Sequence, residues 1–401
     1  MNFEMVGKIS LPKDSDRFHP YEVKNFPASG WTNKTIRFNA ICGDNRHMLQ
    51  VKAGAFADGH GDIYTLTKSS VDSNGKKIKG ELIQIPFKDR LTSDRIPEIA
   101  DFKKFVFDLE KPKRRYLLEK ATEKIKEGNS LTDEELKSME VASEADIQAE
   151  LEKSKKRHHE FISEWDYVDF IKKVFDSGKY NEKNFRIRGS VDYSYSDEKQ
   201  RVYENYIPNR IYLAADDEEE YSTGTVNVLF GAESLDELSV AEKGKYYVNG
   251  WHMEYEQSRK ENIPIPIIIA IPVIEDEKGK KRTEAIKRKF AISDDKIYEY
   301  GITVNMVNGA QKIEITEDML TDEQKDDLEC GLITLDDIRS DLGGSVYGDR
   351  IQEFLFVKPA RGWTKGRKDT VYTTDDMVIK PVEEELPDEV ENLFDDDDEE
   401  L

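Results

Sequence analysis

The feature that most restricts the fold of this chain is a period-two alternation of apolar and polar residues near its N-terminus. In Trp31–Cys42 the apolar side chains recur at every second position, and polar side chains such as Arg37 fill most positions between them. Residues 43–45 have turn composition, and residues 46–53 resume the alternation with Lys52 on the polar side. Such alternation is typical of half-buried strands. It predicts a β-hairpin with Arg37 and Lys52 on its solvent face.

Strand-like segments follow this hairpin and return after a helical region. Residues 108–177 are rich in Glu, Lys, Ala and Leu, and Thr132 with Glu135 forms a capping-box pattern. They predict a solvated helical insertion, with helices at 116–128, 132–156 and 163–175. Asn308 and Gly309 predict a tight hairpin turn. Further strands are expected at 7–11, 63–67, 81–87, 184–195, 206–214, 225–230, 245–255, 263–274, 285–292, 301–307, 311–315 and 350–357, and short helices at 316–329 and 334–342.

Two stretches of the chain resemble each other weakly. Residues 184–214 and 246–274 each contain a strand interrupted by a glycine (Gly189 and Gly250), then a tyrosine, a charged turn and a second strand. A glycine inside a strand marks a bend or bulge of the kind that a small closed barrel needs. A true duplication and a chance similarity both stay open, and the pattern favours two small β-barrels. The fold class predicted is mainly β with helical insertions (α+β).

Composition shifts along the chain predict the domain boundaries. The acidic stretch 216–220 reads as a linker between domains. We therefore expect one domain at 1–215 with a helical insertion at about 108–177, and a second at 222–360. A basic, flexible linker is expected at 361–380 and a disordered acidic tail at 381–401.

The last 21 residues contain twelve carboxylates and no basic residue. Self-repulsion and the shortage of apolar surface predict that this tail stays unfolded. Its scattered apolar residues are typical of a recognition peptide that docks on a partner with a basic rim. The same polyanion could occupy a nucleic-acid groove of its own protein, or could be a solubilising tail without a partner. The candidate partner-binding residues are Phe394, Asp395, Asp396, Asp397, Asp398, Glu399, Glu400 and Leu401.

Charge and cysteine content exclude several classes of protein. The net charge of −23 argues against a highly basic protein that coats chromosomes, so any nucleic-acid contact must be locally basic. Cys42 and Cys330 cannot form a disulfide framework and indicate a reducing compartment. With no secretion signal and no membrane-length apolar run, a cytoplasmic location is expected. The six histidines lack metal-ligand spacing, and the glycine-rich residues 54–61 lack the lysine of a phosphate loop. No enzyme activity, cofactor or metal is therefore expected.

Several of these features together resemble one protein family. Glycine-bent strands, a helix inserted between strands, aromatics and arginines on strand faces and an acidic tail resemble the single-stranded DNA-binding proteins, bacteriophage replication proteins above all. The resemblance implies tandem OB-folds that coat and protect single-stranded DNA during replication, recombination and repair, in the bacterial host cytoplasm. It also implies recruitment of a polymerase, helicase or primase through the tail. Here Phe394 precedes six acidic residues and Leu401, whereas the family usually ends in an aromatic residue.

The resemblance implies which side chains would contact DNA. Aromatic faces stack on bases at about 1–3 kcal/mol each, while Lys and Arg follow the phosphates. The candidate stacking residues are Trp31, Tyr64, Tyr203, Tyr206, Trp251 and Tyr255. The candidate phosphate contacts are Arg37, Arg46, Lys52, Arg186, Arg188, Arg201 and Arg210. For each aromatic the alternative is core packing, and for each arginine it is a solvated surface charge.

Residues 358–368 form a basic segment without any acidic residue, in an otherwise acidic chain. Its candidate site residues are Arg361, Trp363, Lys365, Arg367 and Lys368. Glycines at 362 and 366 predict a mobile loop that contacts DNA, receives the acidic tail, or both. The alternative is a basic linker with an exposed tryptophan. For the whole chain, the alternative function is a structural or assembly protein that makes only protein–protein contacts.

Overall fold

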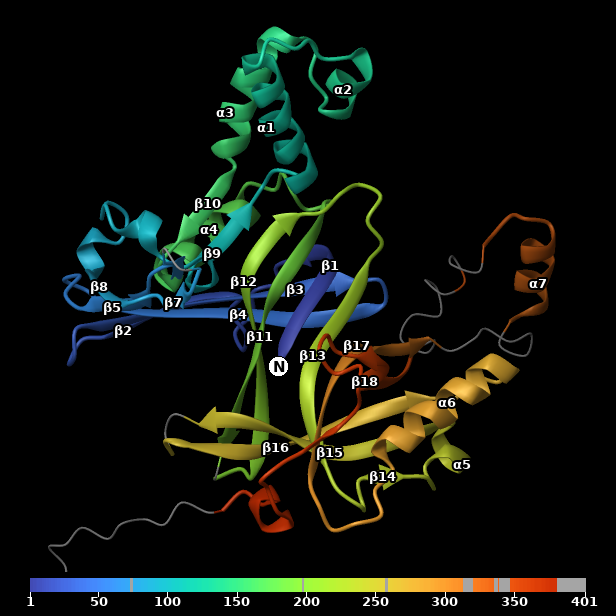
Figure 1. The fold of residues 1–401 in the computed structure, drawn as a ribbon. Coiled ribbons are helices and arrows are strands. Elements are labelled where there is room, and N and C mark those ends of the chain that lie inside the picture. The colour runs from blue at the N-terminus through green and yellow to red at the C-terminus, as the bar shows by residue number, and fades with distance from the viewer. Residues whose placement is uncertain are drawn as a thin grey trace, which may run out of the picture. The chain divides into compact units, whose positions relative to one another are not determined.

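The protein is mainly β, as expected, with a large mixed sheet and a separate group of helices (Figure 1). The structure is a computed structural model that describes residues 1–72, 75–196, 198–256, 259–312, 320–334, 338 and 347–380. The predictions for the acidic tail 381–401, including Phe394 and Leu401, lie outside the described residues. So do most of those for the helix at 334–342 and the strand at 311–315.

The chain forms two compact units that alternate along the sequence. Unit 1 comprises Met1–Asp192, Asn205–Val226 and Gly301–Thr364, and unit 2 comprises Tyr193–Glu204, Asn227–Tyr300 and Lys365–Leu401. Four strands contribute residues to both units: β11 (Asn184–Ser196), β12 (Arg201–Leu213), β13 (Tyr221–Phe230) and β17 (Tyr298–Lys312). The consecutive domains at 1–215 and 222–360 remain a prediction.

Unit 1 holds the N-terminal strands and the helical insertion. Its strands are β1 (Asn2–Ser10), β2 (Tyr21–Phe26), β3 (Trp31–Cys42), β4 (Asn45–Phe56), β5 (Asp62–Leu66), β6 (Ser70–Val71), β7 (Lys77–Ile78), β8 (Leu82–Pro86), β9 (Phe105–Asp108), β10 (His158–Phe161) and β18 (Tyr347–Pro359). Its helices are α1 (Pro112–Lys126), α2 (Asp133–Ser138), α3 (Ile147–Lys155), α4 (Glu164–Asp176) and α7 (Asp322–Glu329).

The β3–β4 hairpin is the organising element of unit 1. Its pairing is unbroken from Trp31 opposite Phe56 to Cys42 opposite Asn45, which confirms the predicted hairpin. β2 pairs along the other edge of β3, with Phe26 opposite Trp31. The apolar positions face α4, where the rings of Phe38 and Phe175 lie 5.5 Å apart. Because α4 covers this face, the alternate residues of β2, β3 and β4 point to the other side.

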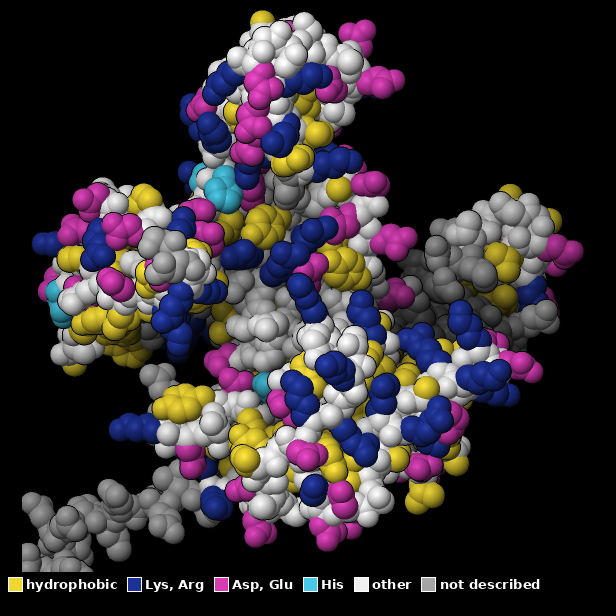
Figure 2. Space-filling model, viewed as in Figure 1, with side chains coloured by type: hydrophobic (Ala, Val, Ile, Leu, Met, Phe, Trp, Pro, Cys, Tyr) yellow, Lys and Arg dark blue, Asp and Glu magenta, His cyan; other side chains and the backbone are white. Residues whose placement is uncertain are grey.

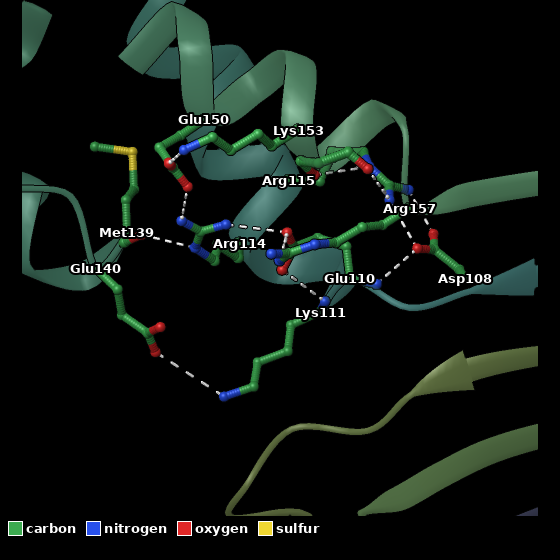
Figure 3. A network of polar contacts seen from close by, with 11 residues as sticks. Asp108, Glu110, Lys111, Arg114, Arg115, Met139, Glu140, Glu150, Lys153 and Arg157 are labelled. Carbon is green, nitrogen blue, oxygen red and sulfur yellow. Dashed lines mark hydrogen bonds and ion pairs between the residues drawn. The ribbon is translucent and has the colours of Figure 1, made fainter. Parts of the chain in front are cut away.

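The helical insertion is held to unit 1 by a network of buried charges (Figure 3). The guanidinium of Arg115 pairs with Asp108, and that of Arg114 binds Glu110 at 3.0 Å and Glu150 at 2.9 Å. Glu110 is nearly fully buried, so it needs this pairing. The predicted capping box at Thr132 is present and begins α2. The helix, however, already ends at Ser138. The predicted helix 132–156 is therefore split into α2, a short 3₁₀ turn and α3.

Unit 2 is built on a second long hairpin, β15 (Lys245–Glu256) with β16 (Glu261–Pro272). Their pairing runs without a bulge from Lys245–Pro272 to Glu256–Glu261. The three prolines of β16 all fall on one parity, and the pairing with β15 continues opposite each of them. The remaining elements of unit 2 are β14 (Leu235–Asp236), α5 (Val240–Lys243), α6 (Glu277–Phe290), β19 (Lys368–Asp369) and a 3₁₀ helix at Thr374–Met377.

Two local predictions are wrong. Residues 285–292 are not a strand, because Asp276 caps α6, which continues to Phe290 with buried residues at helical spacing. Asn308 and Gly309 are not a hairpin turn but lie inside β17, opposite Gln352 and Ile351. A Cβ on Gly309 would come within 2.5 Å of the Asp44 carbonyl oxygen, so this glycine provides close backbone approach rather than a turn.

Candidate nucleic-acid interface

The uncovered face of β2, β3 and β4 gathers more of the predicted side chains than any other described surface of unit 1. We call it the β2–β4 platform. The strand registers place its residues in three parallel rows. The rows are Phe26, Lys24 and Glu22 on β2; Trp31, Asn33, Thr35 and Arg37 on β3; and Phe56, Gly54, Lys52, Gln50, Met48 and Arg46 on β4. From Phe56 to Arg46 the row spans about 33 Å at 3.3 Å per residue.

One end of the platform is aromatic. The Trp31 ring lies over Gly54, since a Cβ there would fall 2.2 Å from the Trp31 Cζ2 atom. Its Nε1–H donates to Asn33 Oδ1 at 2.7 Å, and its ring meets Phe56 edge-on with centroids 4.8 Å apart. The exposed His60 ring stacks on Phe56 at 3.8 Å. Phe26, 44% exposed, lies opposite Trp31 across the β2–β3 pair.

Figure 2 shows apolar side chains gathered at this outer end of unit 1, over β2 and β5. Large apolar side chains left in water at one place on a surface mark a contact site more often than a lone exposed residue does. The exposed rings of Phe26 and His60 offer faces on which bases can stack, beside the half-buried rings of Trp31 and Phe56.

Beyond its aromatic end the platform is cationic. Lys52 and Arg46 are exposed, and neither forms an ion pair with any described residue. Arg37 is more constrained: its guanidinium donates to Gln50 Oε1 at 2.9 Å and to the His19 carbonyl at 3.2 Å. Glu22 lies between Lys24 (3.0 Å) and Arg37 (3.8 Å), and the hydrogen bond from Lys24 lowers the pKa of its carboxyl. Lys52 and Arg46 are therefore the platform cations most available to an anion.

The platform opens at its far end into a groove of about 700 Å³. Arg46 and Met48 line it from β4, Asn39 and Ile41 from β3, and Gly309 from β17. The Asn308 N–H donates to Asn45 Oδ1 at 2.9 Å, which fixes β17 against the β3–β4 turn. Aromatic rings, exposed cations and a groove thus follow one another along a single hairpin.

Arg186, Arg188 and Arg210 lie together elsewhere in unit 1, around two cavities of about 380 and 410 Å³. Two of these arginines already form ion pairs with carboxylates. Arg186 binds Glu218 at 2.5 Å, and Arg188 binds Glu4 at 2.5 Å. Arg210 donates to the Asp101 carbonyl at 2.9 Å. Phosphate contact at Arg186 or Arg188 would first require these pairs to break, so this cluster is less suited to anions than the platform.

Two of the predicted stacking residues pack against apolar side chains, one of them buried and the other partly buried. Tyr206 is 8% exposed, with its ring 5.6 Å from Phe3 and 5.9 Å from His47. Trp251 packs against the apolar cluster that contains Leu229 in unit 2. Tyr206 is therefore closed to a base, and Trp251 is partly buried by its packing in unit 2.

The other predicted aromatics are exposed but lie on other elements. Tyr64 lies on β5 and is 65% exposed. Tyr203, with the Arg201 guanidinium 5.5 Å above its ring, and Tyr255 belong to unit 2. The structure therefore brings Trp31, Arg37, Arg46 and Lys52 to one face, and places none of the remaining aromatic predictions on that face.

The basic segment 358–368 is anchored in part. The half-buried Trp363 ring lies against Gly301, where a Cβ would fall 2.3 Å from its Nε1. Arg367 donates to the carbonyls of Lys289 and Ala291, both at 3.0 Å. Lys368 lies opposite Glu299 in the backbone register of β19 and β17. Arg361 and Lys365 are exposed. These contacts fix the segment at several points, whereas the sequence predicts a mobile loop.

Sequence reasoning missed several platform residues. Phe26 lies on β2, whose sequence YEVKNF lacks clean alternation, and Phe56 and His60 lie just past the predicted end of the hairpin. The available signal was Gly54, whose position among alternating residues marks close approach of another group.

The described residues contain no group of three or more His, Cys, Asp or Glu that could hold a metal ion. Among the described helices, none is both long and apolar enough to cross a membrane.

Comparisons with known proteins identify no family. No family model matches the chain, and no curated protein matches it. Among solved structures, the chain is similar to a deletion variant of the single-stranded DNA-binding protein from Thermus aquaticus. The TM-score is 0.26 and the identity 7%, over 77% of this chain and 86% of that one. A likeness this slight supports no conclusion about function.

Proposed function

We propose that this chain binds single-stranded DNA without strong sequence preference, through the β2–β4 platform. The observation that supports the proposal is the order of groups along the β2–β4 platform. Stackable rings at Trp31, Phe26 and Phe56 are followed by Lys52 and Arg46, cations without an ion-pair partner among the described residues. Unstacked bases and a line of phosphates are the two features of a single strand that such a surface can contact.

The proposal extends to the biological role. The chain would coat and protect single strands during phage-type replication, recombination and repair, in the cytoplasm of a bacterial host, without enzymatic activity of its own. Its small β-units would act as OB-fold-like modules. The tail, with twelve carboxylates in 21 residues, would recruit replication proteins such as a polymerase, helicase or primase.

Fluorescence anisotropy of labelled oligo-dT tests the platform directly. Trp31→Ala and Phe26→Ala should each weaken binding by about 5- to 150-fold, which corresponds to about 1–3 kcal/mol of stacking. Tyr116→Ala is the matched control, because Tyr116 is 57% exposed on α1, within the helical insertion. Lys52→Gln and Arg46→Gln should each reduce the salt slope by about 0.7.

Two results would overturn the proposal. If the Trp31→Ala and Phe26→Ala variants bind oligo-dT as tightly as the wild type, the binding site does not lie on the platform. No binding of oligo-dT at low salt would favour a protein that makes only protein–protein contacts.

A further inference from the structure

Helix α6 of unit 2 is amphipathic, and its apolar side is fully used by the unit. The Asp276 carboxylate accepts from the Gly279 N–H at 2.9 Å and so caps the helix. Gly279, Thr283, Ile286 and Phe290 are buried at helical spacing. The Phe290 ring lies 4.9 Å from that of Phe230 and 5.8 Å from that of Tyr300. The helix is therefore held by its apolar face, and its other faces are left to solvent.

One flank of α6 carries only cations and an alanine. Steps of three or four residues from Lys278 connect five cations and an alanine, while Glu277 and Glu284, four residues before and three after Lys281, lie on the adjoining flank. We call this row the α6 stripe: Lys278, Lys281, Arg282, Ala285, Arg288 and Lys289. Residues at this spacing lie one above another on a helix, about 5–6 Å apart. Figure 2 shows Lys and Arg side chains crowded over α6.

The adjoining flank carries both carboxylates of the helix. It mixes Glu277 and Glu284 with Lys280 and Lys287. The Lys287 ammonium binds Glu237 at 2.9 Å and lies 4.3 Å from the centre of the Tyr246 ring. The acidic residues of the helix thus gather on that flank, and the stripe itself contains none.

The stripe is accessible and extends past the end of the helix. Lys278, Lys281 and Arg288 are exposed, and none forms an ion pair with a residue in the described part of the chain. At the C-terminus of α6, Arg367 donates to the Lys289 and Ala291 carbonyls while its guanidinium lies 4.7 Å from the centre of the Tyr298 ring. Arg367 thus adds a fixed positive charge where the helix dipole alone would be negative.

Five cations in a row of roughly 16 Å suit a ligand with regularly spaced negative charges. A bilayer is a poor match, because an interfacial helix inserts its apolar face into lipid and that face of α6 is buried in the protein. The backbone of a nucleic acid is a good match, because each strand of a duplex presents one phosphate per 3.4 Å along its axis.

We propose that the α6 stripe is a separate contact surface for the nucleic-acid phosphate backbone, able to hold duplex as well as single strands. The stripe contains no aromatic residue, so it has no means of distinguishing unstacked from paired bases. The β2–β4 platform lies in unit 1 and the stripe in unit 2, and the stripe does not depend on the platform's function. A chain with both surfaces is suited to DNA at which a single strand joins a duplex.

The test is binding of a labelled blunt 20-bp duplex by the full chain, followed from 50 to 200 mM salt. The stripe variant carries Lys278→Gln, Lys281→Gln, Arg282→Gln and Arg288→Gln. Four lost phosphate contacts remove about 3.6 from the salt slope, so the wild type should lose about 150-fold more affinity over this range than the variant. A control variant makes the same change in net charge on the helical insertion, with glutamine at Lys120, Lys126, Lys137 and Lys155.

The outcomes separate the alternatives. Equal losses in the stripe and control variants would show a general charge effect and overturn the proposal. Stripe-dependent binding of anionic vesicles, or of a peptide of residues 381–401, in place of duplex would overturn it in favour of a lipid or the protein's own tail. Trp31→Ala should leave duplex binding intact, so failure of the platform and failure of the stripe are distinguishable. Because glutamine is a good helix former, α6 should stay folded in these variants. Thermal melts of the variants check this.

Discussion

Gly54 gives the sharpest test of how the platform is built. The Trp31 ring lies where a side chain at position 54 would be, with the added Cβ 2.2 Å from Cζ2 and 2.8 Å from Cε2. Carbon atoms in contact normally lie 3.5–4.0 Å apart, so in Gly54→Ala the ring must move by more than about 1 Å. Gly54→Ala removes no aromatic residue and changes only the position of the Trp31 ring.

The expected magnitude combines two losses. Displacing the ring breaks the hydrogen bond from Nε1 to Asn33, which is worth about 1 kcal/mol of stability. It also misplaces a base-stacking face worth about 1–3 kcal/mol of binding. Affinity for oligo-dT should therefore fall by about 5- to 150-fold in Gly54→Ala, close to the effect of Trp31→Ala. The intrinsic preference of strands for alanine over glycine, about 0.5–1 kcal/mol, offsets part of the stability loss but none of the binding loss.

The assay is anisotropy with oligo-dT for the wild type, Gly54→Ala, Trp31→Ala and the double variant. If Gly54 acts only by seating Trp31, the double variant should bind like Trp31→Ala alone, because the second change has nothing left to displace. Unchanged binding in Gly54→Ala would refute the reasoning. So would full additivity of the two changes, since it would mean that glycine and ring act on different contacts.

Three further predictions concern other parts of the chain. Ending the chain at Lys380 should raise affinity for oligo-dT at low salt and not at high salt, because twelve carboxylates no longer compete intramolecularly; equal affinity across a salt series would contradict this. Hydrogen bonds to Asp108 and Glu160 raise the pKa of His158 to about 9, so its stabilising effect should be complete below about pH 6.5 and lost as pH rises through about 9. The difference in melting temperature between wild type and His158→Gln should shrink accordingly. Phe290→Ala should destabilise unit 2 by about 3–5 kcal/mol in urea unfolding, since the ring is fully buried.

The elements best predicted from sequence are those specified by local pattern. The alternation in Trp31–Cys42 requires a strand with one buried face, and the strand begins and ends at those residues. The hydroxyl of Thr132 and the carboxylate of Glu135 need only each other's backbone to start a helix, and the helix begins there. Such signals depend on residues within a few positions of one another, so contacts with distant parts of the chain do not change them.

The errors occur where distant residues decide. Asn308 and Gly309 have the composition of a turn, but β17 continues through them because Gly309 must pass close to Asp44. The C-terminal part of α6 was predicted as a strand at 285–292 because its cations obscure the four buried positions that hold the helix. The stripe on its other flank was therefore missed as well.

Local sequence pattern is sufficient to predict a mainly β protein with a helical insertion and with aromatics and arginines along its strands. Which of those side chains face solvent depends on how the strands and helices pack together. Tyr206 and Trp31 are both aromatic residues of strands, yet Tyr206 is enclosed by Phe3 and His47 while Trp31 lies over Gly54 at the surface. The reason is that alternation assigns a residue to one side of a strand, whereas what covers that side comes from residues far away in the chain.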